Sequence, residues 1–172
     1  RSSHKVAFHT DIKKIYNSVQ LAEEHWCFQR YIWQNDLDIK KIPDEKIIKT
    51  LIYGVKSNGN RAERALRKTA KLSAHQYPEV NRIVQNDIYV DDCLSGEISI
   101  ENALKKADEI ELVLNRGEFS LKGVTFSGKD PPEALSTDKR SINVAGMKWF
   151  SKENFISLDT TEVNFAKMKR GK

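Results

Sequence analysis

Three aspartates are the side chains of this sequence best suited to chemistry on a phosphate. Asp91 and Asp92 are adjacent and follow the apolar run at 88–90, and Asp11 follows a strand-like run at 6–10. Clustered carboxylates raise one another's pKa unless a cation neutralises them, and Mg²⁺ prefers such oxygen ligands. Two ions held in this way can activate a hydroxyl and stabilise a leaving oxygen in phosphoryl transfer. The cluster therefore suits a polymerase, a nuclease or a phosphatase, although an Asp-Asp pair alone is typical of a solvated turn.

The elements that must bring these aspartates together are short strands and helices in mixed order. Alternating apolar residues predict strands over 5–10, 27–33, 47–53, 119–126 and 142–149, the last as a strand or hairpin arm. Helical spacing predicts one helical turn at 22–26 and helices over 61–75, from Pro78, and after the capping residue Ser99. The remaining segments are predicted as a helical or irregular stretch at 11–16, a loop or edge hairpin at 35–45, a tight hairpin around 91–92 and a long loop at 127–140. This order favours an α+β domain with helices on one face of a small antiparallel sheet.

The composition permits a nucleic-acid partner but does not require one. The chain has 172 residues, 39% of them apolar, and a formal net charge of +5, which fits one soluble domain with a mildly basic surface. It contains no long apolar stretch of the kind that crosses a membrane or directs secretion. Cys27 and Cys93 lack metal-binding spacing and suggest reduced thiols. We therefore expect an intracellular protein, cytoplasmic, with no membrane partner.

The order of the motifs resembles that of reverse transcriptases, and within them the BEL/Pao-like long-terminal-repeat retrotransposons. The resemblance covers most of the chain, from Val6 to Trp149. The motifs that carry it are Asp11 followed by Tyr16, the loop Tyr53-Gly54-Val55-Lys56-Ser57, the box Tyr89-Val90-Asp91-Asp92, the stretch Gly117-Glu118-Phe119-Ser120-Leu121 and the hairpin Ala145-Gly146-Met147-Lys148-Trp149. The fold that this resemblance implies is a polymerase palm.

The activity implied by the resemblance is RNA-directed DNA synthesis on a primer 3′-hydroxyl. The partners would be an RNA or DNA template with its primer, and deoxynucleoside triphosphates. Asp11, Asp91 and Asp92 would be the catalytic carboxylates. Together with the backbone carbonyl of Ile12 they would hold two Mg²⁺ ions, for which Mn²⁺ could substitute.

The resemblance also assigns nucleotide-binding residues. Tyr16 would exclude a 2′-hydroxyl from the incoming sugar, with a core tyrosine as the alternative interpretation. Gly54 and Ser57 belong to the loop before a helix, and Gly59 stands where the family has a proline. A plain turn is the alternative there. Lys122 is a weaker candidate for the triphosphate, since a solvated strand lysine is the commoner case.

Primer contacts are implied at Tyr89, in the aspartate box, and at Gly146 and Trp149, in the later hairpin called the primer grip. A glycine at position 146 would let the hairpin approach the primer backbone. Trp149 would then pack against a primer base. Ala145 stands where the family has a leucine.

The resemblance divides the chain into a palm over 1–150 and a basic extension over 151–172. A palm and an extension leave out most of the fingers and thumb of a polymerase. Duplex affinity comes largely from phosphate contacts of basic residues, and most of those residues belong to the missing parts. We therefore expect weak or no polymerase activity from this chain alone. An intact element would place the enzyme in a virus-like particle.

Two other functions remain open. One is a non-catalytic remnant of a retroelement that binds nucleic acid or protein. The other is a different two-metal enzyme, such as a nuclease, which would use a further carboxylate or a histidine. The histidines show no ligand spacing, and His9, two residues before Asp11, is expected to share its face only through strand alternation.

Overall fold

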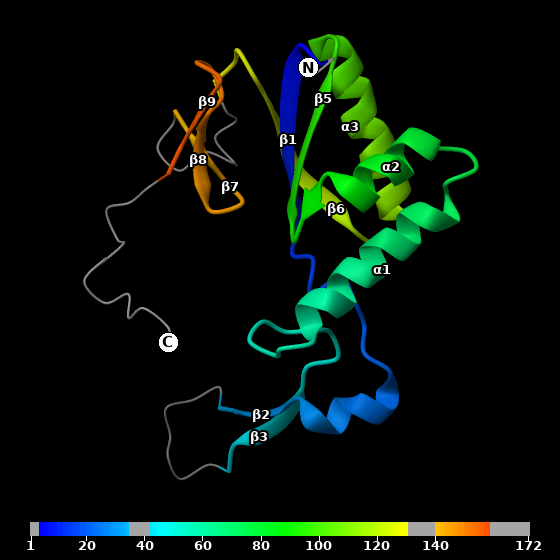
Figure 1. The fold of residues 1–172 in the computed structure, drawn as a ribbon. Coiled ribbons are helices and arrows are strands. Elements are labelled where there is room, and N and C mark those ends of the chain that lie inside the picture. The colour runs from blue at the N-terminus through cyan, green and yellow to red at the C-terminus, as the bar shows by residue number, and fades with distance from the viewer. Residues whose placement is uncertain (1–3, 35–41, 131–139, 159–172) are drawn as a thin grey trace, which may run out of the picture. The chain divides into compact units, whose positions relative to one another are not determined.

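The computed structural model describes residues 4–34, 42–130 and 140–158 (Figure 1). Its strands are β1 Val6–Lys13, β2 Arg30–Trp33, β3 Asp44–Ile47, β4 Ile88–Tyr89, β5 Asp92–Glu97, β6 Ser120–Phe126, β7 Ile142–Val144, β8 Met147–Phe150 and β9 Phe155–Ser157. Its helices are the 3-10 helix η1 Glu23–Phe28 and the α-helices α1 Asn58–Leu72, α2 Pro78–Asn86 and α3 Ile100–Asn115. This mixture of helices and antiparallel strands confirms the expected α+β class. Parts of the loops predicted at 35–45 and 127–140, and the basic tail, lie outside the described residues.

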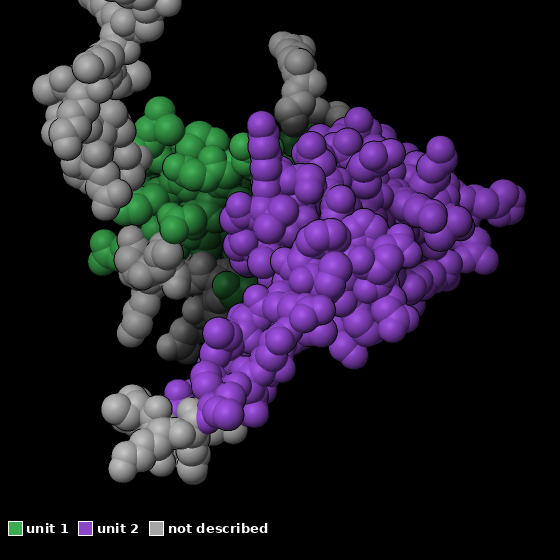
Figure 2. Space-filling view, turned by 90° about the horizontal axis from the view of Figure 1, so that it is seen from below, with its two compact units in different colours: residues 1–11, 87–108, 121–172 green, residues 12–86, 109–120 purple. Residues whose placement is uncertain are grey.

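The chain divides into two compact units (Figure 2). Unit 1 comprises residues 1–11, 87–108 and 121–172, and unit 2 comprises residues 12–86 and 109–120. The three aspartates belong to unit 1, whereas the predicted nucleotide loop after Tyr53 belongs to unit 2.

The main sheet of unit 1 has the strand order β4-β5-β1-β6, which puts the first strand of the chain in its interior. β1 pairs antiparallel with β5 in a register that runs from Val6 opposite Glu97 to Asp11 opposite Asp92. The strand extends further than predicted, because Ile12 is buried and continues the alternation of Phe8 and Thr10. Asp11 therefore lies within β1, and the helical or irregular segment expected from this residue is wrong as far as Lys13.

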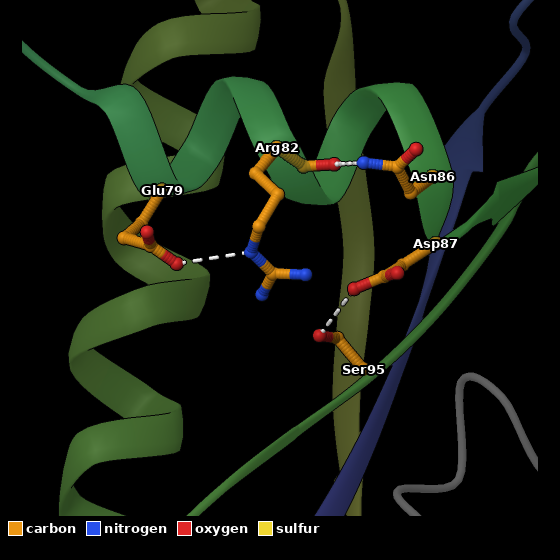
Figure 3. Close-up of polar contacts among 5 residues, drawn as sticks. All are labelled: Glu79, Arg82, Asn86, Asp87 and Ser95. Atoms are coloured by element: carbon orange, nitrogen blue, oxygen red, sulfur yellow. Dashed lines mark hydrogen bonds and ion pairs between the residues drawn. The ribbon is translucent and has the colours of Figure 1, made fainter.

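The short hairpin β4–β5 is anchored just before its first strand. The backbone carbonyl of Asp87 accepts a hydrogen bond from the amide of Leu94, and its carboxylate accepts one from the Ser95 hydroxyl at 2.8 Å (Figure 3). Since Ser95 lies in the middle of β5, these bonds fix the residue just before β4 to the second strand of the hairpin. The predicted tight hairpin around the paired aspartates is confirmed.

A second sheet in unit 1 has the strand order β7-β8-β9. The pairing of β7 with β8 confirms the predicted hairpin arm, and Ile142, Val144 and Trp149 form a buried cluster against Ala7 of β1. β9 pairs with β8 through Phe150 opposite Phe155. The ordered sheet therefore continues past residue 150, into the segment expected as an extension.

Helices α1 and α2 form the body of unit 2. α1 buries Ala62, Leu66 and Ala70 at helical spacing, and it begins at Asn58, three residues before the predicted start. α2 begins at Pro78 as predicted, and within it Arg82 pairs with Glu79 (Figure 3). Among the described residues, no helix combines the length and apolar character needed to cross a lipid bilayer.

Helix α3 continues from unit 1 into unit 2. Its start is capped as predicted, since the Ser99 hydroxyl accepts a hydrogen bond from the amide of Asn102 at 3.2 Å. The buried face of α3 comprises Ala103, Ala107, Ile110, Val113 and Leu114. The apolar spacing of this segment also predicts Leu104 and Leu112 on the buried face, but both are exposed. Leu104 lies about a quarter turn from that face and Leu112 about half a turn.

The β2–β3 hairpin of unit 2 departs most from the sequence prediction. A half-buried strand was expected over 27–33, but residues 23–28 form η1 and the strand covers only Arg30–Trp33. Its Ile32 is 75% exposed and its Trp33 is 47% exposed. The strand expected over 47–53 is also wrong, since β3 ends at Ile47.

Candidate active site

Strand register brings the three predicted catalytic aspartates to one end of the main sheet. Asp11 of β1 lies directly opposite Asp92 of β5 in the antiparallel ladder. Asp91 lies immediately before β5, in the loop that joins it to β4. Since opposed side chains on an antiparallel pair share a face of the sheet, Asp11 and Asp92 are close neighbours.

The loop that carries Asp91 is tight. Tyr89 pairs with Asp92, so Val90 and Asp91 form a two-residue connection. Val90 has a φ of 58°, a value that a β-branched residue rarely adopts. Such a conformation costs about 1–3 kcal/mol and persists only where its surroundings impose it. The strained turn therefore fixes Asp91 at the tip, beside Tyr89, which is 67% exposed and accessible to a ligand.

Both carboxylate oxygens of Asp92 accept hydrogen bonds from the protein. The Nε2 of His9 lies 2.8 Å from Oδ1, and the backbone amide of Ala145 donates to Oδ2 at 2.8 Å. Burial raises the pKa of Asp92, but the hydrogen bonds from His9 and Ala145 and the attraction of His9 outweigh burial, so the pKa falls below its ordinary value. The side chain of Asp92 is therefore held as a carboxylate.

His9 is almost completely buried, with 1% of its surface exposed. Because the Asp92 carboxylate can only accept, Nε2 of His9 donates the hydrogen bond between them. Nδ1 is buried and has no hydrogen-bond partner among the described residues. His9 therefore donates to Asp92 from a fixed position in β1.

Asp11 has the opposite electrostatic surroundings. Burial raises the pKa of Asp11, and the negative charges of Asp91 and Asp92 raise it further. The positive charge of Lys122, on β6, acts in the other direction, as does His9. The charge of Asp11 is thus destabilised by its neighbours, and a bound cation would relieve this repulsion.

The donor chemistry of this end of the sheet suits a hard cation in an open site. Asp11 and Asp91 offer carboxylate oxygens whose mutual repulsion a divalent ion would neutralise. Asp92 accepts two hydrogen bonds from the protein, and within residues 4–34, 42–130 and 140–158 no group of three or more His, Cys, Asp or Glu side chains is arranged to hold a metal ion. An ion held by Asp11 and Asp91 would therefore have to take its remaining ligands from water or from a substrate, as Mg²⁺ commonly does.

The predicted primer-grip hairpin contributes the amide of Ala145 to this site. Its two-residue loop has φ values of 48° at Ala145 and 79° at Gly146, the positive pair of a type I′ turn. Trp149 is 3% exposed, and its Nε1 donates to Asn154 at 3.3 Å. This burial favours a core role for Trp149 over the expected contact with a primer base, and leaves the Ala145-Gly146 loop as the exposed part of the hairpin.

The predicted nucleotide-binding residues other than Lys122 lie in unit 2. The rings of Tyr16 and Tyr53 pack with centroids 4.2 Å apart, and the hydroxyl of Tyr16 lies 3.5 Å from the position that a Cβ on Gly59 would occupy. Gly54 has a φ of 87°, which explains a glycine at that position. Ser57 directly precedes α1, where its side chain makes no capping hydrogen bond.

His9 and the amide of Ala145 are site groups that the motifs did not single out. The alternation of β1 indicated that His9 shares a face with Asp11, but its contact with Asp92 depends on strand register. The amide of Ala145 is a backbone group and has no sequence signal of its own.

A scan against protein-family models gives no match for this chain, and a search of curated proteins gives none either. The similarity to reverse transcriptases therefore rests on the order of the motifs in the sequence.

Proposed function

We propose that this chain is the palm portion of an RNA-directed DNA polymerase from a BEL/Pao-like retrotransposon. The observation that carries the proposal is the convergence of Asp11, Asp91 and Asp92, from motifs eighty residues apart, at one end of a sheet. The residue order Tyr89-Val90-Asp91-Asp92 in a strained, exposed hairpin supports a polymerase over other two-metal enzymes.

The proposed reaction joins a deoxynucleotide to a primer. The primer 3′-oxygen forms a bond to the α-phosphorus, the bond from that phosphorus to the bridging oxygen breaks, pyrophosphate leaves and the hydroxyl proton passes to water. Mg²⁺, when bound, supplies charge neutralisation and lowers the pKa of the primer hydroxyl. Asp11 and Asp91 would hold the ions, and Lys122 adds positive charge beside Asp11. By the resemblance alone, Tyr16 would discriminate against the ribose 2′-hydroxyl.

Mn²⁺ titration of the full chain, followed by NMR, tests this proposal. Paramagnetic Mn²⁺ should broaden the amide signals around Asp11 and Asp91 first, and Asp91→Asn should remove this response. Asp108→Asn is the matched control, since Asp108 is an exposed acidic residue on α3. Uniform broadening of all acidic surfaces, unchanged by Asp91→Asn, would contradict the proposed site.

A primer-extension assay tests the reaction itself. With the chain in excess over a primer–template and Mn²⁺ present, we expect slow addition of one nucleotide that Asp11→Asn abolishes. The same product with Asp11→Asn would assign the activity to a contaminant. Cleavage of the template instead of extension would favour a nuclease.

A non-catalytic binding protein is the second candidate function, and the exposed β2–β3 hairpin favours it. Ile32 and Trp33 of this hairpin present apolar surface to solvent, and Lys46 lies 5.4 Å from the centroid of the Trp33 ring. Binding of single-stranded nucleic acid that requires Trp33, with no Mn²⁺ response at Asp91, would support this function over the polymerase.

A further inference from the structure

The hydrogen bonds of Asp92 join three segments that are far apart in the sequence. His9 in β1 contacts one carboxylate oxygen at 2.8 Å, and the other oxygen accepts the amide of Ala145 at 2.8 Å. We infer that Asp92 is a positioning residue that links β1 to the Ala145-Gly146 loop, and that His9 acts through it to hold this loop in place. The role of that loop at a primer rests on the proposed function.

The His9 side chain is rigidly packed and can therefore fix the position of the Asp92 carboxylate. Its ring is 1% exposed, and its neighbours in β1, Phe8 and Thr10, are fully buried. Close packing around a buried ring leaves it no alternative rotamer without displacing core atoms. Since Nδ1 has no partner among the described residues, the bond from Nε2 to Asp92 is the only polar contact of the ring there.

The Ala145-Gly146 loop needs an external contact to fix its position. Both residues are exposed, and a side chain at Gly146 would meet no atom within 4 Å. The strands of the hairpin are anchored through Ile142, Val144 and Trp149, but these side chains lie on either side of the loop. The hydrogen bond from the Ala145 amide to Asp92 is the contact that connects the loop itself to the main sheet.

The two hydrogen bonds give Asp92 a structural role of its own. Each oxygen accepts one bond at 2.8 Å, from His9 or from Ala145, and so contributes to the link between strand and loop. Loss of the first bond would leave a buried imidazole without a polar partner, and loss of the second would release the loop. The Asp92 carboxylate is therefore the link between strand and loop.

The test compares His9→Leu with His9→Gln, because leucine fills similar space without a donor and glutamine can still donate from Nε2. In His9→Leu the amide signal of Ala145 should move upfield and gain mobility in ¹⁵N relaxation. Primer–template affinity should fall about tenfold, the effect of losing one charge-assisted hydrogen bond. Mn²⁺ broadening at Asp11 and Asp91 should not change. His9→Gln should restore the Ala145 signal and the affinity, and the exposed-site control His75→Leu should alter neither.

Two results would overturn the inference. An Ala145 signal that is unchanged in His9→Leu would show that the loop is held by other contacts. An Ala145 signal that is unchanged in Asp92→Ala would show the same, and this variant also serves if His9→Leu does not fold. If the wild-type chain binds neither Mn²⁺ nor primer–template, the proposed function and the primer role both fail, while the Ala145 signal still decides whether His9 positions the loop.

Discussion

Asp11 and Asp92 face each other across one strand register, yet the protein treats their charges in opposite ways. Burial and the charge of Asp91 raise the pKa of Asp11, with a further contribution from Asp92. Burial also raises the pKa of Asp92, but the hydrogen bonds from His9 and Ala145 outweigh it and the pKa falls. Two opposed carboxylates from different motifs therefore have different surroundings: the charge of Asp11 is destabilised by its neighbours, whereas the charge of Asp92 is stabilised by hydrogen bonds within the fold.

Asp92→Ala should produce the largest effect, because it leaves buried His9 without a partner and frees the Ala145 amide. We expect the free energy of unfolding to fall by about 2–3 kcal/mol, as when one side of a charge-assisted hydrogen bond is removed from a buried site. Urea unfolding monitored by circular dichroism measures it. Asp130→Ala is the control, since the pair of Asp130 with Lys152 is exposed and such pairs contribute about 0–1 kcal/mol. Equal losses in the two variants would remove the distinction between Asp92 and an ordinary surface carboxylate.

Gly146→Ala should cause the next largest loss in the free energy of unfolding, and it acts on the loop that is bonded to Asp92. Its φ of 79° is unfavourable for a residue with a Cβ, at a cost of about 1–2 kcal/mol in the free energy of unfolding. Gly59→Ala is a matched control, because a Cβ there lies 3.5 Å from the Tyr16 hydroxyl, an ordinary contact. Urea unfolding of both variants measures the difference. A smaller loss at Gly146 than at Gly59 would mean that the loop adapts to the side chain.

Asp11→Asn should stabilise the protein modestly, by up to about 1 kcal/mol at pH 7. A raised folded-state pKa means that the contribution of Asp11 to stability is present below its unfolded-state pKa and is lost as the pH rises through the folded value. The gain in Tm should therefore be seen at neutral pH and vanish in acid, where Asp11 is protonated in both states.

Asp92→Asn should instead lower Tm at neutral pH. The pKa of Asp92 is lowered in the folded protein, so the stabilising contribution of Asp92 is present at neutral pH and is lost as the pH falls through the folded value. Thermal unfolding from pH 3 to pH 7 distinguishes the two, and parallel profiles would contradict the comparison.

Lys122→Met should have the smallest effect, which is a change in the pKa of Asp11 alone. Lys122 lowers the pKa of Asp11, so its removal should raise that pKa further, whereas the pKa of Asp92 should not change. Carboxyl ¹³C signals followed through a pH titration measure both groups. Lys129→Met, at an exposed lysine of the same unit, should move neither. A matching change at Asp92 would show that the two carboxylates titrate as one group.

The sequence predicted the elements that carry the three aspartates better than the contacts that support them. The hairpin around Asp91 could be predicted because apolar arms flank a polar tip, and the α3 cap because Ser99 precedes a helical pattern. The bond between His9 and Asp92 could not, since it joins residues 83 positions apart and exists only in one strand register. A shift of that register by one residue would turn His9 to the other side of the sheet.

The β2–β3 hairpin shows a second limit of prediction from sequence. Alternation in the segment 27–33 indicates a strand with one apolar face, but alternation does not specify what covers that face. Ile32 is 75% exposed in the described chain. Periodicity therefore predicted the strand at Arg30–Trp33 correctly, but the prediction that one of its faces is buried is wrong.

The place of β1 in the sheet has a consequence for the chain during its synthesis. β1 is made before its partners β5 and β6, which begin only at Asp92 and Ser120. At about 5–20 residues per second, the ribosome leaves this strand unpaired for several seconds. Its hydrogen-bonding edges and buried Phe8 are open to other chains in that interval, so nascent-chain protection by a chaperone should matter more for yield than the stability of the finished fold.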